Sequence, residues 1–362
     1  MPKHVVIADV AARAGVSAQT VSRVLTGRGA VSEPTRAKVN AAIRELNYHP
    51  NLAARALAAG ATPAIGVLMM GELSFGRAQS YTQFVQMQSD RSVFVLSLAV
   101  SPSDDRAMAS AMGYFSAANV QAIVLMGQNW EAMCRVYPLA SQPVIAVINK
   151  ELPGDVSRVE LEQHKSTTLL LRHLYDRGAR RIVHISPRVV DVDARLRRDA
   201  YQEFCTRYGL EQRIVDVGNW SAEEGYRAGE ALVAGEAATT GKFAAERRAA
   251  GSADPLEGGS RGDLGFDAIF AANDFLALGV SRALRDAAQL TPGRDYALAG
   301  YDDLTLDAYM SPSLTTVRQN YRLLAATISR QIESRLKGED PRVAVLPNDV
   351  VIRESSSLFS AR

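Results

Sequence analysis

The stretch IADVAARAGVSAQTVSRVLTG, residues 7–27, predicts two short helices that meet at a tight corner. The apolar residues of its first half recur at the spacing of one helix face: Ile7, Val10, Ala11 and Ala14. Gly15 favours the left-handed backbone that ends a helix, and Ser17 is a typical N-terminal cap of the next one. The second helix has its apolar side at Val21, Val24 and Leu25. Its outward side is therefore expected at Ala18, Gln19, Ser22 and Arg23.

A third helix is predicted after Ser32, with Pro34 in its first turn and an apolar face at Val39, Ile43 and Leu46. Three such helices form a helix-turn-helix unit, whose second helix enters the major groove of DNA. Gln19 can pair with adenine and Arg23 with guanine or a phosphate, whereas Ser17 and Thr20 are expected to hold phosphates. The alternative is a three-helix subdomain with a solvated basic face.

Positive charge is concentrated in the first sixth of the chain. Residues 1–60 contain eight Lys or Arg and three Asp or Glu, although the 362-residue chain has 41 basic and 39 acidic residues. Such a basic segment is expected to contact a polyanion. The chain is 47% hydrophobic and 22% charged, as in soluble folded proteins, and its length indicates two or three domains.

Several classes of protein are excluded by what the sequence lacks. No apolar run is long enough for a membrane span and no export signal precedes the first helix, so we expect a cytoplasmic protein without a membrane partner. Cys134 and Cys205 show neither metal-ligand nor disulfide spacing. There is no GxSxG motif and no glycine-rich phosphate loop, and the five histidines are scattered. We expect no enzyme activity, no cofactor, no metal and no catalytic residue.

After Pro63 the sequence alternates between short apolar strands and helices. The first set of strands is AIGVLMM, VFVLSLAV, AIVLMG and VIAVIN, and the second is RIVHISP, RIVDVG, DAIFAAN and YALAGYDD. Helices are expected at residues 164–177, 194–208, 222–234 and 275–288. This alternation predicts an α/β fold with two doubly wound parallel-sheet lobes, which follow the N-terminal all-α headpiece.

Polar residues follow three of these strands. Asn149 and Lys150 follow VIAVI, Asn273 follows DAIFAA, and Asp302 follows YALAGY. Parallel sheets bind ligands beyond the carboxyl ends of their strands, and amides, carboxylates and an arginine suit a ligand with several hydroxyl groups. The alternative for each residue is a turn or a helix cap.

The motifs DVAARAGVSAQTVSRVLTG and VSEPTRAKVNAAIRELNYHPNLAARAL closely resemble the headpiece of the lac-repressor family of bacterial transcription regulators. The resemblance implies a DNA-binding headpiece at residues 1–50 and a hinge helix and linker at 51–63. In that family a leucine of the hinge enters the minor groove, which implies DNA contact by Leu57, with Asn51 in the same segment. The alternative is a plain interdomain linker.

Residues 64–362 resemble the family's periplasmic-binding-protein-like domain, which binds ligand and forms the dimer. DARLRRDAY resembles the sugar-gripping segment, which implies Arg197 with Asp193 close by. GNWSAEEGY implies that the Trp220 indole stacks on a sugar ring. Three further motifs resemble segments of the family's ligand site: AANDFLALG, GYDD and LTTVRQNY. They imply that Asn273, Asp302 and Tyr321 bind the effector. The effector implied is a sugar or glycoside.

Three segments depart from the family pattern. GELSFGRAQSY replaces a usual Gly-Pro motif, so Phe75 is the expected apolar contact there. Asn149-Lys150 replaces a common Asp-Arg pair. Residues 235–265 are rich in Gly, Ala and Ser where relatives have a short crossing, which predicts a mobile surface insertion.

The predicted molecule is a homodimer, because no leucine heptad follows the last strand and two headpieces match a pseudo-palindromic operator. We expect a sequence-specific repressor that a sugar releases from its operator. A corepressor-dependent regulator with a non-sugar effector, and a sugar-binding protein without a regulatory role, are the alternatives.

Overall fold

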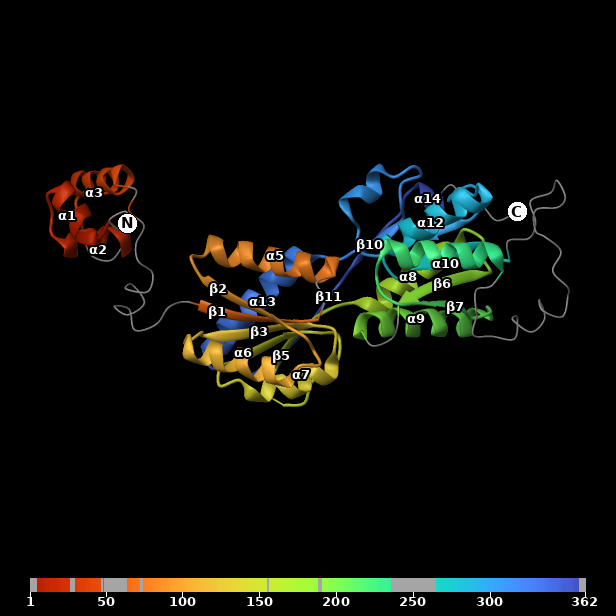
Figure 1. The fold of residues 1–362 in the computed structure, drawn as a ribbon, viewed down its shortest axis with the longest axis horizontal. Helices are drawn as coiled ribbons and strands as arrows, with labels where there is room; N and C mark the ends of the chain where they lie inside the picture. Colours follow the sequence, from red (N-terminus) through yellow and green to blue (C-terminus); the bar gives the residue numbers. More distant parts are fainter. Residues whose placement is uncertain are drawn as a thin grey trace. The chain divides into compact units, whose positions relative to one another are not determined.

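The computed structural model describes residues 5–26, 30–46, 48, 64–71, 74–154, 156–187, 191–235 and 265–357. The chain divides into two compact units, Met1–Pro63 and Ala64–Arg362. The described elements of both units are drawn in Figure 1.

The first unit contains the helices α1 (Ile7–Ala14), α2 (Ala18–Thr26) and α3 (Glu33–Glu45). Gly15 ends α1 with φ = 66°, and Ser17 caps α2 by accepting a 3.2 Å hydrogen bond from the N–H of Thr20. The helices share a small core of buried side chains: Val10, Ala11, Val21, Val39, Ala42 and Tyr48. The three helices predicted from the sequence are therefore confirmed.

The first lobe of the second unit is built on a six-stranded parallel sheet with the order β11-β5-β4-β3-β1-β2. Its strands are β1 (Ala64–Met70), β2 (Phe94–Val100), β3 (Ala122–Gly127), β4 (Val144–Val147), β5 (Ser157–Leu161) and β11 (Val343–Leu346). One face packs on α6 (Asp105–Ala117) and α7 (Trp130–Val136), which is followed by the 3₁₀ helix η1 (Tyr137–Leu139). The opposite face packs on α5 (Phe75–Asp90) and α13 (Tyr321–Leu336) (Figure 1).

The second lobe has a four-stranded parallel sheet with the order β7-β6-β8-β9. Its strands are β6 (Ile182–Pro187), β7 (Arg213–Val217), β8 (Ala268–Ala271) and β9 (Ala297–Ala299). The helices α8 (Gln163–Asp176) and α9 (Val192–Tyr208) cover one face, and α10 (Ala222–Ala234) and α12 (Asp274–Ala288) cover the other. The 3₁₀ helix η2 (Thr305–Tyr309), the antiparallel pair β10 (Thr316–Arg318) and β12 (Asp349–Val351), and α14 (Glu354–Ser357) complete it. The predicted parallel-sheet lobes are confirmed.

The chain crosses between the two lobes three times, whereas the order of the two sets of strands in the sequence suggests a single crossing. The chain enters the second lobe after β5, returns to the first lobe between β10 and α13, and leaves it again between β11 and β12. Both α13 and β11 therefore complete a sheet and a core that begin more than 200 residues earlier, and this return was not predicted.

Candidate functional site

The exposed side of α2 carries the residues predicted to contact DNA. Ser17, Ala18, Gln19, Ser22 and Arg23 are exposed, and Thr20 is half-buried. Val21, on the opposite side of the helix, is fully buried in the core, so the outward direction of the others is fixed. Asn51 and Leu57, the two predicted contacts in the hinge, lie outside the described residues.

Two hydroxyl groups meet at the N-terminus of α2. The Oγ of Ser17 lies 2.9 Å from the Oγ1 of Thr20, and both flank the first-turn N–H groups, where a helix attracts anions. This geometry suits a phosphate of the DNA backbone, the partner predicted for both residues.

In the second unit, a cavity of about 60 Å³ that opens to solvent lies between the two lobes. Seven of the nine residues predicted to bind the effector line it: Asn149, Asp193, Arg197, Trp220, Asn273, Asp302 and Tyr321. Asn149, Asn273 and Asp302 lie where the sequence placed them, just beyond the carboxyl ends of parallel strands.

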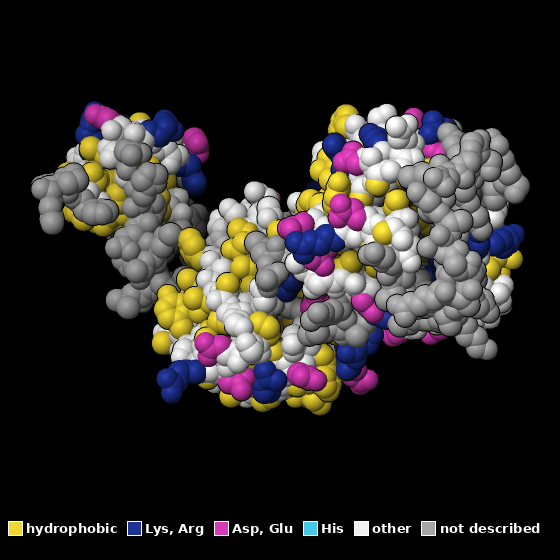
Figure 2. Space-filling view, turned by 45° about the vertical axis from the view of Figure 1, so that its right-hand side comes forward, with side chains coloured by type: hydrophobic (Ala, Val, Ile, Leu, Met, Phe, Trp, Pro, Cys, Tyr) yellow, Lys and Arg dark blue, Asp and Glu magenta, His cyan; other side chains and the backbone are white. Residues whose placement is uncertain are grey.

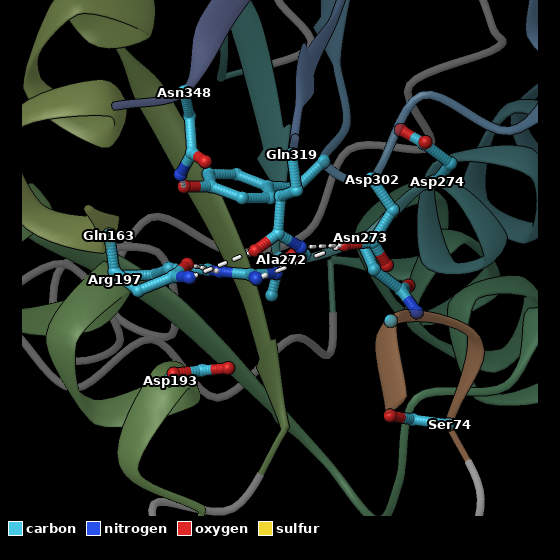
Figure 3. Close-up of polar contacts among 12 residues, drawn as sticks. Ser74, Gln163, Asp193, Arg197, Ala272, Asn273, Asp274, Asp302, Gln319 and Asn348 are labelled. Carbon is cyan, nitrogen blue, oxygen red and sulfur yellow. Dashed lines mark hydrogen bonds and ion pairs between the residues drawn. The ribbon is translucent and has the colours of Figure 1, made fainter. Parts of the chain in front are cut away.

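Arg197 is the most strongly held of these side chains and is only 3% exposed. Its Nε donates to the Oε1 of Gln163 at 2.9 Å, and its Nη1 donates to the carbonyl of Ala272 (Figure 3). Its guanidinium plane lies 3.6 Å from the centre of the Tyr301 ring, and its Nη2 is 3.9 Å from Asp302 Oδ1. The α9 arginine is thus fixed with its charge at the wall of the cavity.

A chain of amides continues from Arg197 to Asp302. Gln163 Nε2 donates to Gln319 Oε1 at 3.0 Å, and Gln319 Nε2 donates to Asp302 Oδ1 at 2.6 Å and to the Tyr321 hydroxyl at 3.0 Å. Figure 3 shows Arg197, Gln163, Gln319 and Asp302 facing one another around the cavity. Because Gln319 lies between β10 and α13, the network spans a crossing between the lobes.

Asp302 is held in a conformation that few residues other than glycine adopt, with φ = 114°. Burial raises the pKa of its carboxyl group to about 7, while the charge of Arg197 acts in the opposite direction. A carboxyl that is partly protonated near neutral pH can both donate a hydrogen bond to a ligand hydroxyl and accept one from it.

Two polar pairs lie on the walls of the cavity. Asn149 of the first lobe donates through Nδ2 to Asp193 of α9, and it accepts from the N–H of Leu161 at 2.9 Å. The burial of Asp193 raises the pKa of its carboxyl group, although Arg197 lowers it. Trp220 Nε1 donates to Asp191 Oδ2 at 2.8 Å, which holds the indole at the edge of the cavity.

Asn273 has a structural role. Its Oδ1 accepts from the N–H of Leu276 at 2.9 Å as the N-terminal cap of α12, and its Nδ2 donates to the carbonyl of Trp220 at 3.0 Å. These contacts match the helix cap that the sequence left open as the alternative role of Asn273.

Two predicted residues are not among the cavity-lining side chains. The Phe75 ring packs edge-on against Tyr321, with 6.4 Å between ring centroids, so it supports the wall from behind. The Lys150 ammonium lies 3.9 Å from the centre of the Trp130 ring.

Other lining residues were missed by the sequence argument. The polar members of this group are Ser74, Arg77, Ser80, Gln128, Asp191 and Gln319. Gln128 directly follows β3, so the strand-end rule could have found it. Gln163, which touches Arg197 from outside the lining set, carried no signal because its partner Gln319 lies 156 residues away.

The cavity combines carboxylates, amides, two arginines and the aromatic side chains of Trp220 and Tyr321, a set of groups that can bond to a ring bearing several hydroxyls. No group of three or more His, Cys, Asp or Glu side chains in the described parts of the chain could hold a metal ion. None of the described helices is both long and apolar enough to cross a bilayer.

Comparison with known proteins places both units in described families. Residues 6–51 match "Bacterial regulatory proteins, lacI family", and residues 171–356 match "Periplasmic binding protein-like domain". The ribose operon repressor of Escherichia coli K12 is 31% identical over 86% of this chain and 87% of its own length. The lactose operon repressor of the same strain is 28% identical over 90% of this chain and 83% of its own length.

A solved structure of the lac repressor dimer bound to operator and the anti-inducer ONPF is similar in fold, with a TM-score of 0.76. It is 26% identical in sequence, and the match covers 98% of this chain and 99% of the other.

Proposed function

Because the chain belongs to the lacI family of bacterial regulatory proteins, we propose that it is a transcriptional repressor whose operator affinity is controlled by a sugar or glycoside bound in the cavity. The single observation that carries the effector class is the wall of the cavity. Arg197 and Asp302 are buried there in one hydrogen-bonded network, and the Trp220 indole lies at its edge.

The polarity of this wall favours a neutral polyol. Each buried carboxylate or guanidinium has lost its water shell, and ligand hydroxyls replace those lost hydrogen bonds. The ribose and lactose operon repressors are named for sugar operons, which supports the same class of effector.

DNA binding is proposed for α2. Gln19 and Arg23 are the candidates for base contacts, and Ser17 and Thr20 are the candidates for phosphate contacts. For the hinge, DNA contact by Asn51 and Leu57 remains part of this proposal.

The active form is proposed to be a homodimer. Apolar side chains stay exposed on both lobes: Tyr309 is 85%, Leu306 42% and Phe94 37% exposed. In Figure 2, hydrophobic side chains gather on part of the first lobe, while charged side chains of both signs are interspersed on the second lobe. A second copy of the chain would cover such surfaces and supply the second headpiece that a two-fold operator needs.

The function is tested by operator binding across a panel of sugars. DNA selected by the full chain from a random pool serves as the operator, and fluorescence anisotropy measures its affinity with saturating ribose, lactose, glucose, galactose or cellobiose. We expect one of these sugars to lower operator affinity at least fivefold. A rise in affinity would favour the corepressor alternative, and constant affinity with bound sugar would favour a binding protein without a regulatory role.

Trp220 provides the matched variants for this test. Trp220→Ala should weaken the response to the active sugar roughly tenfold, because the stacking surface is lost, whereas Trp220→Phe keeps an aromatic face and most of the response. Operator affinity without sugar should stay unchanged in both.

A further inference from the structure

The amide side chains around the cavity differ in how many of their hydrogen bonds are already made. Asn149 and Asn273 each use both ends of the amide within the protein. Gln163 and Gln319 do the same within the network that reaches Arg197 and Asp302. Asn149, Asn273 and Gln319 line the cavity with these bonds already made, and Gln163 supports Arg197 from behind the lining.

Gln128 lines the same cavity but lacks such a partner. Its Oε1 is buried and accepts no hydrogen bond from any of the described residues. Burial of a carbonyl oxygen without a hydrogen-bond donor is unfavourable, so a ligand that supplies the donor gains affinity. Within the described part of the cavity, it is the lining amide whose oxygen is left without a donor.

The backbone of Gln128 is fixed from the opposite lobe. Its carbonyl accepts a 3.1 Å hydrogen bond from the N–H of Val192, the first residue of α9, and Val192 is buried in the core cluster of the first lobe. Its position directly after β3, in the middle of the first sheet, leaves little freedom to move away. The backbone from which the Gln128 amide extends is therefore fixed at the wall.

We propose that Gln128 determines ligand specificity by accepting a hydrogen bond from a hydroxyl group of the bound sugar through Oε1. An amide oxygen only accepts, so the ligand must present a donor at this point of the first-lobe wall. A sugar that lacks this hydroxyl leaves the oxygen unpaired and binds more weakly. The inference rests on the proposed sugar effector and adds a contact to it.

The test uses Gln128→Met, which keeps the length of the side chain and removes the acceptor. Titration calorimetry of the full chain with ribose, lactose, glucose, galactose and cellobiose identifies a sugar that binds the wild type. We expect Gln128→Met to weaken that sugar about 5- to 100-fold, the range that corresponds to losing a buried hydrogen bond.

Two further readouts separate ligand contact from a structural role. The unfolding temperature of the sugar-free variant should be unchanged or raised, because the substitution removes an unsatisfied acceptor. Among singly deoxygenated forms of the active sugar, one should bind wild type and variant with equal affinity, because it lacks the hydroxyl that donates to Gln128.

Gln142→Met is the matched control. The Oε1 of Gln142 is also buried without a hydrogen-bond donor among the described residues, but this residue precedes β4 and does not line the cavity. Its replacement should leave sugar affinity unchanged.

The outcomes distinguish the two proposals. If no sugar of the set binds the wild type, the sugar effector and the role of Gln128 are both overturned. If a sugar binds the wild type and Gln128→Met binds it equally well, the role of Gln128 alone is overturned. The role of Gln128 is also overturned if Gln128→Met lowers the unfolding temperature as well as the sugar affinity.

Discussion

The polar side chains of the cavity fall into those that hold other protein groups and those that face into the cavity with unused capacity. Arg197 has its Nε, one Nη and its ring-facing plane occupied by protein, so its contribution to a ligand is restricted to the charge and donors that remain. Asn273 has no free amide end. Chemical type alone, as read from the sequence, does not separate these two groups.

Asp302 makes stability depend on pH. Its pKa is raised from 3.8 to about 7, so the folded state binds the proton more tightly than the unfolded chain. This stabilisation is fully present below about pH 3.8 and is lost as the pH rises through 7. Asp302→Asn cannot ionise and should lack this component.

Urea unfolding of sugar-free wild type and Asp302→Asn between pH 5 and 8 measures the difference. We expect the wild type to lose stability relative to the variant as the pH rises, by up to about 1.4 kcal/mol per pH unit. A difference that is constant with pH, or that changes in the opposite direction, would contradict the assignment.

The role of the outward side chains of α2 in DNA binding can be tested by substitution and operator titration. Gln19→Ala and Arg23→Ala should each lower operator affinity about 5- to 150-fold, as expected when a bidentate base contact is lost. Sugar affinity should not change. Arg342→Ala, which removes an exposed arginine of the second unit, is the control and should keep normal operator affinity at the same salt concentration.

Among the secondary-structure elements, the corner between α1 and α2 depends most on one residue. Gly15 has φ = 66°, and a Cβ added there would meet nothing within 4 Å, so only the backbone conformation opposes a substitution. Gly15→Ala should destabilise the first unit by about 1–2 kcal/mol. Thermal unfolding followed by calorimetry detects this as a lower transition for that unit.

Gly113 is the contrasting position. It lies exposed inside α6 with nothing within 4 Å of an added Cβ, so Gly113→Ala should stabilise the second unit by about 0.5–1 kcal/mol. If both substitutions change stability in the same direction, the positive φ of Gly15 does not determine the effect of adding a Cβ there.

Strands and helices were predictable where the apolar pattern is local. The period of Ile7, Val10 and Ala14 specifies α1, and runs such as AIVLMG specify buried strands. The return of α13 and β11 to the first lobe was not predictable, because Leu324 and Ile328 carry the same pattern whichever sheet they cover. The strand-end rule located Asn149, Asn273 and Asp302, but the pairing of Gln163 with Gln319 depends on that return.

For the complete chain, the central expectation is that operator and sugar affect each other by the same factor. If a saturating sugar lowers operator affinity tenfold, saturating operator must lower sugar affinity tenfold, because binding linkage is reciprocal. Calorimetric titration of the sugar into free protein and into the protein–operator complex measures the second factor, and operator titrations with and without the sugar measure the first. Unequal factors would show that the sugar acts on a species other than the operator-bound chain.

The return of the chain also sets the order in which the protein can be completed during synthesis. When the second sheet has left the ribosome, the first sheet still lacks α13, whose Leu324, Ala325 and Ile328 cover one of its faces, and it lacks the edge strand β11. A nascent chain therefore carries an uncovered apolar surface until α13 and β11 have been synthesised. A premature stop codon between β10 and α13 would leave that surface exposed permanently, so a truncation there damages the lobe that was made first.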